Sequence, residues 1–323
     1  MFFALVSGMK QKSFSSVQLV NALDSIFIAS FLKIFKIFFL KSKMKEKSRD
    51  FIRLQPISLY VMISCGLVWT KERKPHMYQY LIVCPLVFLA GFIDSIAGGG
   101  GLISLPAYMA AGIPPHLALG TNKMSSTMGT IVSTARFAKN GFINMKLSLL
   151  AALFAVIGSV IGAHLSLLAS EGVLKGMMIV VLPVVAFYVL KNKNMGDTEE
   201  ISIPHKKQML ISMGAALVVG CYDGFYGPGT GTFLLLLLTG LAKMNVRSAS
   251  GTTKVINLSS NIAALVTFLI NGKVLIPLGL VSGLFCIAGH YIGSGLVVKN
   301  GLKIVRPVVF VVLICLFVKI IKG

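Results

Sequence analysis

The sequence predicts an all-α polytopic membrane protein built from two homologous repeats. Hydrophobic residues make up 55% of the 323-residue chain and charged residues only 13%, about half the charged fraction of a soluble domain. The mean hydropathy is +0.84. Apolar runs recur at about the twenty-residue length that spans a bilayer core, and motifs from the first half of the chain return in the second half. We therefore expect about four membrane spans in each repeat.

The Lys and Arg residues behind the net charge of +21 lie where membrane proteins usually carry them. Thirteen of the 31 Lys and Arg lie in residues 1–76, and most of the others lie in short loops between apolar runs, where cations orient membrane proteins. No nucleic-acid-binding motif accompanies them, so nucleic acid is not an expected partner. Residues 1–76 form a basic N-terminal extension. It contains an interfacial helix or a weak span, or it reflects a start codon annotated upstream of Met77.

The first repeat is predicted over residues 77–195, a loop over 196–206 and the second repeat over 207–323. The expected elements of the first repeat are 78–97, 102–113 (interrupted by Pro106), 117–138, 147–169 and 173–190. Those of the second are 208–226, 233–241, 249–270, 274–298 and 304–321. The second element of each repeat is too short to cross a bilayer, so we expect short broken or re-entrant helices after the glycine-rich motifs. Eight crossings are favoured, and ten crossings with inverted repeats stay open.

Each repeat places an aspartate before a glycine run at the end of its first span. The two copies read Gly91-Phe92-Ile93-Asp94-Ser95-Ile96-Ala97-Gly98-Gly99-Gly100-Gly101 and Gly220-Cys221-Tyr222-Asp223-Gly224-Phe225-Tyr226-Gly227-Pro228-Gly229-Thr230-Gly231. A carboxylate facing lipid costs about 3 kcal/mol, so Asp94 and Asp223 are expected to face the bundle interior or a wet cavity. They are predicted to couple or gate transport, or to cap the helix that follows.

The clustered glycines are predicted to break the backbone and expose N–H groups. The residues expected to do so are Gly98, Gly99, Gly100, Gly101, Gly227, Gly229 and Gly231. The positive end of the short helix that follows then points at whatever occupies the break. Neither run continues into the Lys-Ser/Thr of a nucleotide-binding loop. The GxxxG pairs Gly158/Gly162 and Gly289/Gly293 are attributed instead to close helix packing.

A lysine lies about one turn into the third element of each repeat. An offset of 131 residues pairs Lys123 with Lys254, and each follows a Gly-Thr pair. Paired cations beside hydroxyl and amide groups suit a small oxyanion, although they could instead neutralise the two aspartates or snorkel to the membrane interface. The predicted substrate-binding residues are Lys123, Lys254, Asn122, Thr121, Thr252, Thr253 and Asn257. Asn261 lies one turn from Asn257 and could line the same cavity, with Ser125, Ser126 and Ser133 as loose counterparts in the first repeat. His164 and His290 are assigned no role.

These motifs, with Gly120-Thr121-Asn122-Lys123 and Tyr222-Asp223-Gly224-Phe225-Tyr226-Gly227-Pro228, resemble the sulfite exporter TauE/SafE family of bacterial permeases over residues 78–321. The resemblance is greatest to the branch known as probable membrane transporters. It implies a multi-pass protein of the bacterial cytoplasmic (inner) membrane. It also implies movement of small anions, often sulfite, sulfonates or other organosulfur compounds.

The predicted function is therefore a secondary transporter of small anions that works by alternating access at the repeat interface. No ATP-binding motif is visible, and neither is a nucleophile–base set or metal-ligand spacing, so no enzyme activity, cofactor or metal is expected. The alternative is a non-transporting membrane scaffold or assembly protein. The expected partners are the lipid bilayer and a small anionic substrate, with homo-oligomerisation left open.

Overall fold

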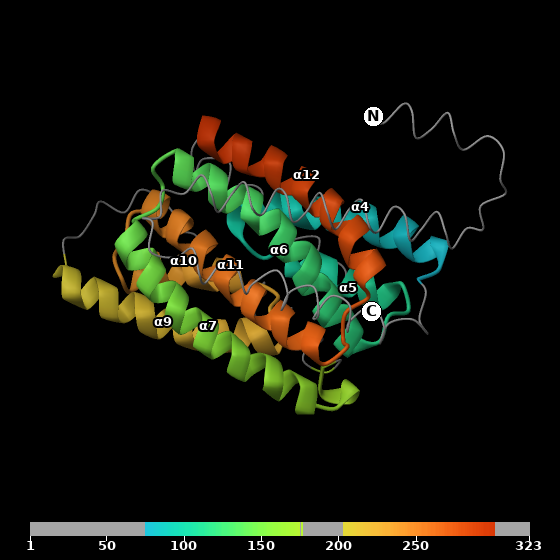
Figure 1. Cartoon of the computed structure of the whole chain (residues 1–323). Helices are drawn as coiled ribbons and strands as arrows, with labels where there is room; N and C mark the ends of the chain where they lie inside the picture. The colour runs from blue at the N-terminus through green and yellow to red at the C-terminus, as the bar shows by residue number, and fades with distance from the viewer. Residues whose placement is uncertain (1–74, 175, 177–202, 301–323) are drawn as a thin grey trace, which may run out of the picture. The chain divides into compact units, whose positions relative to one another are not determined.

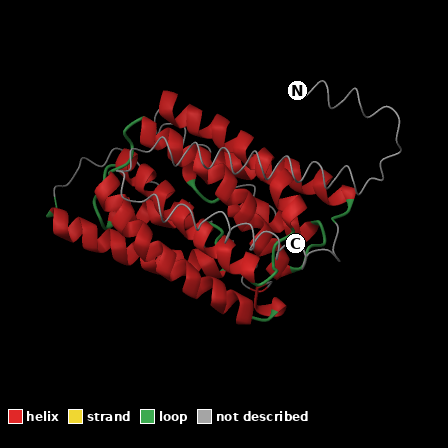
Figure 2. Cartoon of the chain, viewed as in Figure 1, coloured by secondary structure: helices red, strands yellow, loops and turns green. Residues whose placement is uncertain are grey.

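The computed structural model describes residues 75–174, 176 and 203–300. Within these residues it consists of helices joined by loops and turns, without a strand (Figures 1 and 2). The helices are α4 Met77–Ala97, α5 Gly101–Ala110, α6 Pro115–Lys139, α7 Met145–Leu168, α9 His205–Phe225, α10 Thr230–Gly240, α11 Val246–Ile270 and α12 Ile276–Asn300. The predicted all-helical class is confirmed.

Helices from the two halves of the chain pack against each other in long pairs. Helix α4 lies along α12, and α7 lies along α9, on opposite sides of the bundle (Figure 1). Helices α6 and α11 contact each other between these pairs, and each also packs against the last long helix of the other half. The described bundle is therefore interleaved, and neither half forms a separate body.

Five of these helices are long and apolar enough to cross a membrane: α4, α7, α9, α11 and α12. Helices α5 and α10 are apolar but have only 10 and 11 residues. The chain is accordingly a multi-pass membrane protein. The span predicted at 304–321 lies outside the described residues. So does the span predicted at 173–190, except for residues 173, 174 and 176, and so do almost all residues of the N-terminal extension.

Helix α6 is as long as α11, with 25 residues, yet it is not among the apolar helices. Its middle carries threonine, serine, asparagine and lysine, and most of these side chains are buried in the bundle. The Thr121 hydroxyl accepts a hydrogen bond from the Leu275 N–H at 2.9 Å, and the Thr134 hydroxyl donates to the Lys254 carbonyl at 3.3 Å. Because most of these polar side chains are buried and bond to their own helix or to neighbouring segments, α6 needs no apolar surface at its centre.

The two GxxxG pairs lie where the long helices approach most closely. A Cβ atom on Gly162 of α7 would lie 2.7 Å from the Phe225 nitrogen of α9, and one on Gly289 of α12 would lie 2.6 Å from the Phe92 nitrogen of α4. Gly158 and Gly293 likewise face backbone atoms of the partner helix. Only a residue without a side chain fits at such distances, so the packing role predicted for these glycines is confirmed.

Local sequence signals set several helix ends. The Asn144 side chain accepts the Leu147 N–H at the start of α7, and Asn245 accepts the Ser248 N–H at the start of α11, as N-cap residues do. The interruption predicted at Pro106 is absent, because α5 continues through this residue. A proline removes one intrahelical hydrogen bond, and Pro106 is buried together with its neighbours Leu105 and Ala107.

Candidate functional site

Two glycine turns meet at the centre of the bundle. The first follows α4 and has φ values of 72° at Gly98 and 100° at Gly99; the second follows α9 and has φ values of 97° at Gly227 and 87° at Gly229. Residues other than glycine rarely adopt these left-handed backbone conformations. The Thr232 hydroxyl donates to the Gly98 carbonyl at 3.0 Å, which ties α10 of the second half to the turn of the first.

The other glycines predicted to break the backbone lie at the starts of the short helices. Gly101 and Gly231 belong to the first turns of α5 and α10, and Gly100 has helical dihedral angles as the N-cap of α5. A Cβ atom on Gly98 would lie 2.5 Å from the Gly231 carbonyl carbon. The glycines therefore bring the two turns into backbone contact, as well as shaping each turn.

Asp94 lies at the end of α4 and caps the first glycine turn. Its Oδ1 atom accepts the N–H groups of Gly99 at 3.1 Å and Gly100 at 3.0 Å. Its Oδ2 atom lies 3.4 Å from Lys254 Nζ, and Lys254 also donates to the Asp94 backbone carbonyl. This carboxylate thus binds the backbone N–H groups that the turn leaves free. Of the two roles predicted for Asp94, transport coupling and helix capping, this geometry corresponds to capping.

Asp223 occupies the corresponding place at the end of α9 but has different partners. Its Oδ1 atom accepts the Thr230 hydroxyl at 2.8 Å, and its Oδ2 atom accepts the Ser260 hydroxyl at 2.6 Å. Pro228 stands where the first turn has Gly99, and proline has no N–H to donate. The second carboxylate is therefore bound by side-chain hydroxyl groups where the first is bound by backbone amides.

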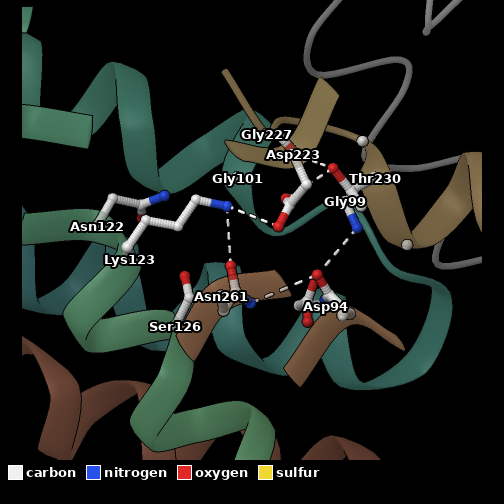
Figure 3. Close-up of a pocket in the computed structure, with 13 residues that line it drawn as sticks. Asp94, Gly99, Gly101, Asn122, Lys123, Ser126, Asp223, Gly227, Thr230 and Asn261 are labelled. Atoms are coloured by element: carbon white, nitrogen blue, oxygen red, sulfur yellow. Dashed lines mark hydrogen bonds and ion pairs between the residues drawn. The ribbon is translucent and has the colours of Figure 1, made fainter. Parts of the chain in front are cut away.

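Each lysine pairs with the aspartate of the other half of the chain. Lys123 Nζ lies 2.8 Å from Asp223 Oδ2 and donates to Asn261 Oδ1 at 2.9 Å (Figure 3). Lys254 pairs with Asp94. The side chains of the first pair are 4% and 3% exposed, so both charges are removed from solvent. Two aspartates and two lysines leave the centre of the bundle with no net formal charge.

A small polar cavity opens beside the Lys123–Asp223 pair. It has a volume of about 30 Å³, which is room for about two water molecules. Figure 3 shows Lys123 and Asn122 reaching the cavity from α6 and Asp223 from the opposite side. The remaining lining residues are Asp94, Gly99, Gly101, Ser126, Gly227, Gly229, Thr230, Gly231, Asn257 and Asn261.

The cavity includes some of the predicted binding residues and leaves out others. Lys123, Asn122 and Asn257 line it, whereas Thr121, Thr252, Thr253 and Lys254 do not. Thr121 bonds to the backbone before α12. Thr252 accepts the Ser148 hydroxyl at 3.1 Å, so both threonines connect neighbouring helices.

Two buried side-chain atoms beside the lysines have no hydrogen-bond partner among the described residues. They are Asn122 Oδ1 and Thr253 Oγ1, and the offset of 131 residues that pairs the lysines also pairs these two positions. An unsatisfied buried polar atom costs about 1–3 kcal/mol. Asn122 lines the cavity, and its amide group can offer either an oxygen or two N–H donors to an occupant.

Several site residues had little or no signal in the sequence. Asn261 and Ser126 were considered as neighbours of the predicted set, but Thr230 and Ser260 gave no indication of contacting Asp223. His290, to which no role was assigned, lies with Nε2 3.6 Å from Asp94 Oδ2 and Nδ1 3.0 Å from the Ser133 hydroxyl. Among the described residues, no group of three His, Cys, Asp or Glu side chains is placed to hold a metal ion.

Comparisons with known proteins agree with this organisation. The chain is 38% identical over 248 residues to "Probable membrane transporter protein ORF9" of Sinorhizobium sp, an alignment that covers 77% of this chain and 94% of the relative. It is 34% identical over 231 residues to "Probable membrane transporter protein YfcA" of Escherichia coli strain K12, covering 70% and 84%. A "Probable membrane transporter protein" of Haemophilus influenzae is 33% identical over 228 residues, covering 69% and 87%.

No solved structure matches the chain. The relatives are bacterial proteins named as membrane transporters, and with the five apolar helices they identify a multi-pass protein of the bacterial cytoplasmic membrane. The family model described as "Sulfite exporter TauE/SafE" matches residues 83–320. The chain belongs to the sulfite exporter TauE/SafE family of membrane transporters.

Proposed function

We propose that this protein is a secondary transporter of small anions, with sulfite, a sulfonate or another organosulfur compound as substrate. The observation that supports this most directly is Lys123, a cation that is 3% exposed and lines a polar cavity at the centre of a membrane bundle. A charge buried inside a membrane protein is costly, and it commonly marks a substrate or ion pathway. The family description, a sulfite exporter, supports the anionic class of substrate.

The binding site in this proposal is the cavity beside the Lys123–Asp223 pair. The Lys123 ammonium attracts the anion, and the amide groups of Asn122, Asn257 and Asn261 supply hydrogen-bond donors around it. Lys254 keeps Asp94 and the first glycine turn in position. In the present conformation the cavity of about 30 Å³ is far smaller than the roughly 300 Å³ or more of an organic ligand site. Binding an organosulfur anion would therefore require this cavity to widen.

Alternating access requires two bodies that move relative to each other around the site. Because the halves interleave, we propose that each body combines helices of both repeats: α4 and α6 with α12, and α9 and α11 with α7. Helix lengths support the repeat itself: α4, α5, α6 and α7 have 21, 10, 25 and 24 residues, and α9, α10, α11 and α12 have 21, 11, 25 and 25.

The close contacts also correspond between the halves. Cβ atoms at Gly158 and Gly162 would meet the carbonyls of Leu217 and Cys221, and those at Gly289 and Gly293 would meet the carbonyls of Phe88 and Phe92. The offset of 131 residues relates the glycines and the offset of 129 relates the carbonyls. In one set the glycines belong to the first half and the carbonyls to the second, and in the other set the roles are reversed. This reciprocity favours a two-fold axis that relates the two repeats.

The short helices α5 and α10 complete the proposed transport path. At 1.5 Å per residue they are about 15 Å long, half of a hydrocarbon core of about 30 Å. We propose that they are broken or re-entrant segments whose N-terminal ends, with the glycine turns, face the cavity. Such half-helices at a repeat interface are a recurring way to present positive dipole ends to an anion inside the bilayer.

Anion flux into proteoliposomes tests this proposal. The full-length protein is reconstituted, and sulfite, sulfate, thiosulfate, taurine and sulfoacetate are offered in turn under an imposed pH gradient. We expect saturable flux of at least one of them, and we expect Lys123→Ala to reduce that flux at least tenfold. Lys139→Ala is the matched control, since Lys139 is on the same helix but exposed, and its flux should equal that of the wild type.

Two results would contradict the proposal. Absence of flux for all five compounds in folded wild-type protein would favour the scaffold alternative. Equal loss in Lys123→Ala and Lys139→Ala would mean that the cavity has no special role. Size-exclusion profiles of each variant in detergent distinguish loss of transport from loss of folding.

A further inference from the structure

The two buried ion pairs at the centre of the bundle are built differently. The partners of the Asp94 carboxylate in the first glycine turn are backbone N–H groups, and its charged partner is the Lys254 ammonium. The titratable His290 also faces it, but its Nε2 atom lies 3.6 Å from Asp94 Oδ2, too far for a hydrogen bond. Backbone amides and ammonium groups donate hydrogen bonds and cannot accept them. A proton on Asp94 would therefore have to displace donors that already occupy this carboxylate, and would leave Lys254 without a counter-charge. The surroundings of Asp94 favour a permanently ionised group.

Asp223 has partners that can reverse their role. Thr230 and Ser260 bind it through hydroxyl groups, which both donate and accept. Each hydroxyl also has a second acceptor within reach: the Thr230 hydroxyl lies 2.6 Å from the Gly227 carbonyl, and the Ser260 hydroxyl lies 3.1 Å from the Asn257 carbonyl. If Asp223 takes up a proton, either hydroxyl can turn its own hydrogen to that carbonyl and accept the new one from the carboxylic acid. The site can therefore satisfy both protonation states of Asp223.

Among the described residues, Lys123 is the one cation in contact with Asp223. Helix α6 contributes Lys123 at 2.8 Å, and α9 with its following turn contributes the phenols Tyr222 and Tyr226. Helices α10 and α11 contribute the hydroxyls already named. Helix α7 approaches with Ser159, whose hydroxyl donates to the Ser260 carbonyl. Neutralising Asp223 would therefore leave the Lys123 ammonium beside the cavity with the Asn261 carbonyl as its remaining partner.

On the basis of the proposed anion transport, we propose that Asp223 takes up the proton that travels with the anion, while Asp94 stays ionised. One proton from the aqueous side forms an O–H bond on the Asp223 carboxylate. The anion then takes the place of this carboxylate at Lys123 Nζ, and Lys123 remains protonated throughout. No bond of the anion is made or broken. The site carries no net charge before binding, and it carries none after binding one proton and one monovalent anion.

This stoichiometry predicts how the driving forces act. Because one proton and one monovalent anion move together, no net charge crosses the membrane, and the membrane potential should not affect accumulation. With a pH difference of one unit, a monovalent anion should reach about a tenfold higher concentration in the more alkaline compartment. A divalent anion bound with the same single proton would add one negative charge to a buried site, so monovalent anions should be preferred.

The test uses the full-length protein in proteoliposomes and methanesulfonate as a monovalent probe, followed by sulfite, thiosulfate and sulfoacetate. In the wild type we expect about tenfold accumulation of methanesulfonate per pH unit, with no change when a potassium diffusion potential is imposed. The divalent thiosulfate and sulfoacetate should be bound and carried less well. Asp223→Asn, which is neutral at every pH, should lose this accumulation. It should still exchange labelled for unlabelled anion, at a rate that no longer depends on pH.

A binding measurement supports the same conclusion without transport. Calorimetric titration of the detergent-solubilised protein in two buffers of different ionisation enthalpy gives the number of protons taken up per anion, which should be about one in the wild type and zero in Asp223→Asn. The matched variant Asp94→Asn should keep an uptake of about one proton per anion. Both variants remove the counter-charge of a buried lysine, so both should melt below the wild type, and only protein that is folded by size exclusion is compared.

The outcomes separate this inference from the proposed function. If the wild type carries an anion but takes up no proton with it, or if proton uptake is lost in Asp94→Asn and kept in Asp223→Asn, the role assigned to Asp223 is wrong and anion transport stands. If voltage drives accumulation and the pH difference does not, the coupled proton is also excluded. If the folded wild type binds or carries neither these probes nor any of the five compounds of the flux assay, the proposed function fails, and the role of Asp223 fails with it.

Discussion

Replacing Gly98 by alanine tests the contact between the two glycine turns. Gly98 has φ 72° and ψ 160°, a region that residues other than glycine occupy at a cost of about 1–3 kcal/mol. The added Cβ would also lie 2.5 Å from the Gly231 carbonyl carbon and 2.7 Å from the Thr232 nitrogen. These are backbone atoms, so relief requires one turn to move away from the other. Overpacking of this kind costs about 1–3 kcal/mol.

The two costs together predict a loss of about 2–6 kcal/mol in the free energy of unfolding for Gly98→Ala. Gly141→Ala is the matched control, because Gly141 also has a positive φ, 69°, but has no atom within 4 Å of the position of a Cβ. It should lose only the roughly 1–2 kcal/mol of the left-handed conformation. The difference between the variants isolates the contact between the turns.

Thermal unfolding in detergent, followed with a thiol-reactive dye, measures both variants. Cys84 and Cys286 are free and buried, so they react as the bundle opens. At about 2–4 °C per kcal/mol for a chain of this size, Gly98→Ala should melt at least about 4 °C below the wild type and clearly below Gly141→Ala. Equal melting temperatures for the two variants would refute the close approach of the turns.

Three further predictions concern the same bundle. Gly162→Ala should reduce the melting temperature by several degrees, because the α9 backbone occupies the space of the new Cβ. In the control Gly214→Ala the new Cβ meets open space, so this variant should be neutral or stabilised by up to about 1 kcal/mol. The reverse order of melting temperatures would contradict the packing of α7 on α9. Lys123→Ala should cost about 3–5 kcal/mol by leaving a buried charge unpaired, and a double-mutant cycle with Asp223→Ala should recover much of this loss, while fully additive losses would exclude the pair. Thr232→Val should cost about 1–3 kcal/mol, since it leaves the Gly98 carbonyl without its donor, and an unchanged melting temperature would exclude that hydrogen bond.

The sequence alone predicted the helical class and an interior location for the two aspartates and the two lysines. Asp94 and Lys123 stand in apolar or buried segments, and their recurrence in the second half of the chain pointed to a shared interior location. The apolar runs gave most helix bounds to within a few residues, because length and hydropathy depend on local sequence. The packing role of Gly162 followed from its GxxxG spacing in the same way.

The pairing of the charges could not be predicted, because it depends on how distant helices cross. Lys123 and Asp94 are close in the sequence, yet each pairs with a residue of the other half. The hydroxyl partner Thr230 had no signal, since threonine is common at a helix start for other reasons. Hydropathy alone would not identify α6 as a helix of the bundle, because a helix whose polar side chains are buried against other helices does not need an apolar sequence.

The most direct test of the proposed function is to locate the anion itself. A structure determined with a selenium- or bromine-containing analogue of a transported anion, with data collected for anomalous scattering, reports the position of the heavy atom. We predict one peak in the cavity bounded by Asn122, Asn257 and Asn261, with an oxygen of the anion in hydrogen-bond contact with Lys123 Nζ and the Asp223 carboxyl displaced from it. A peak beside Lys254 or outside the bundle, with Lys123 still bound to Asp223, would contradict this account.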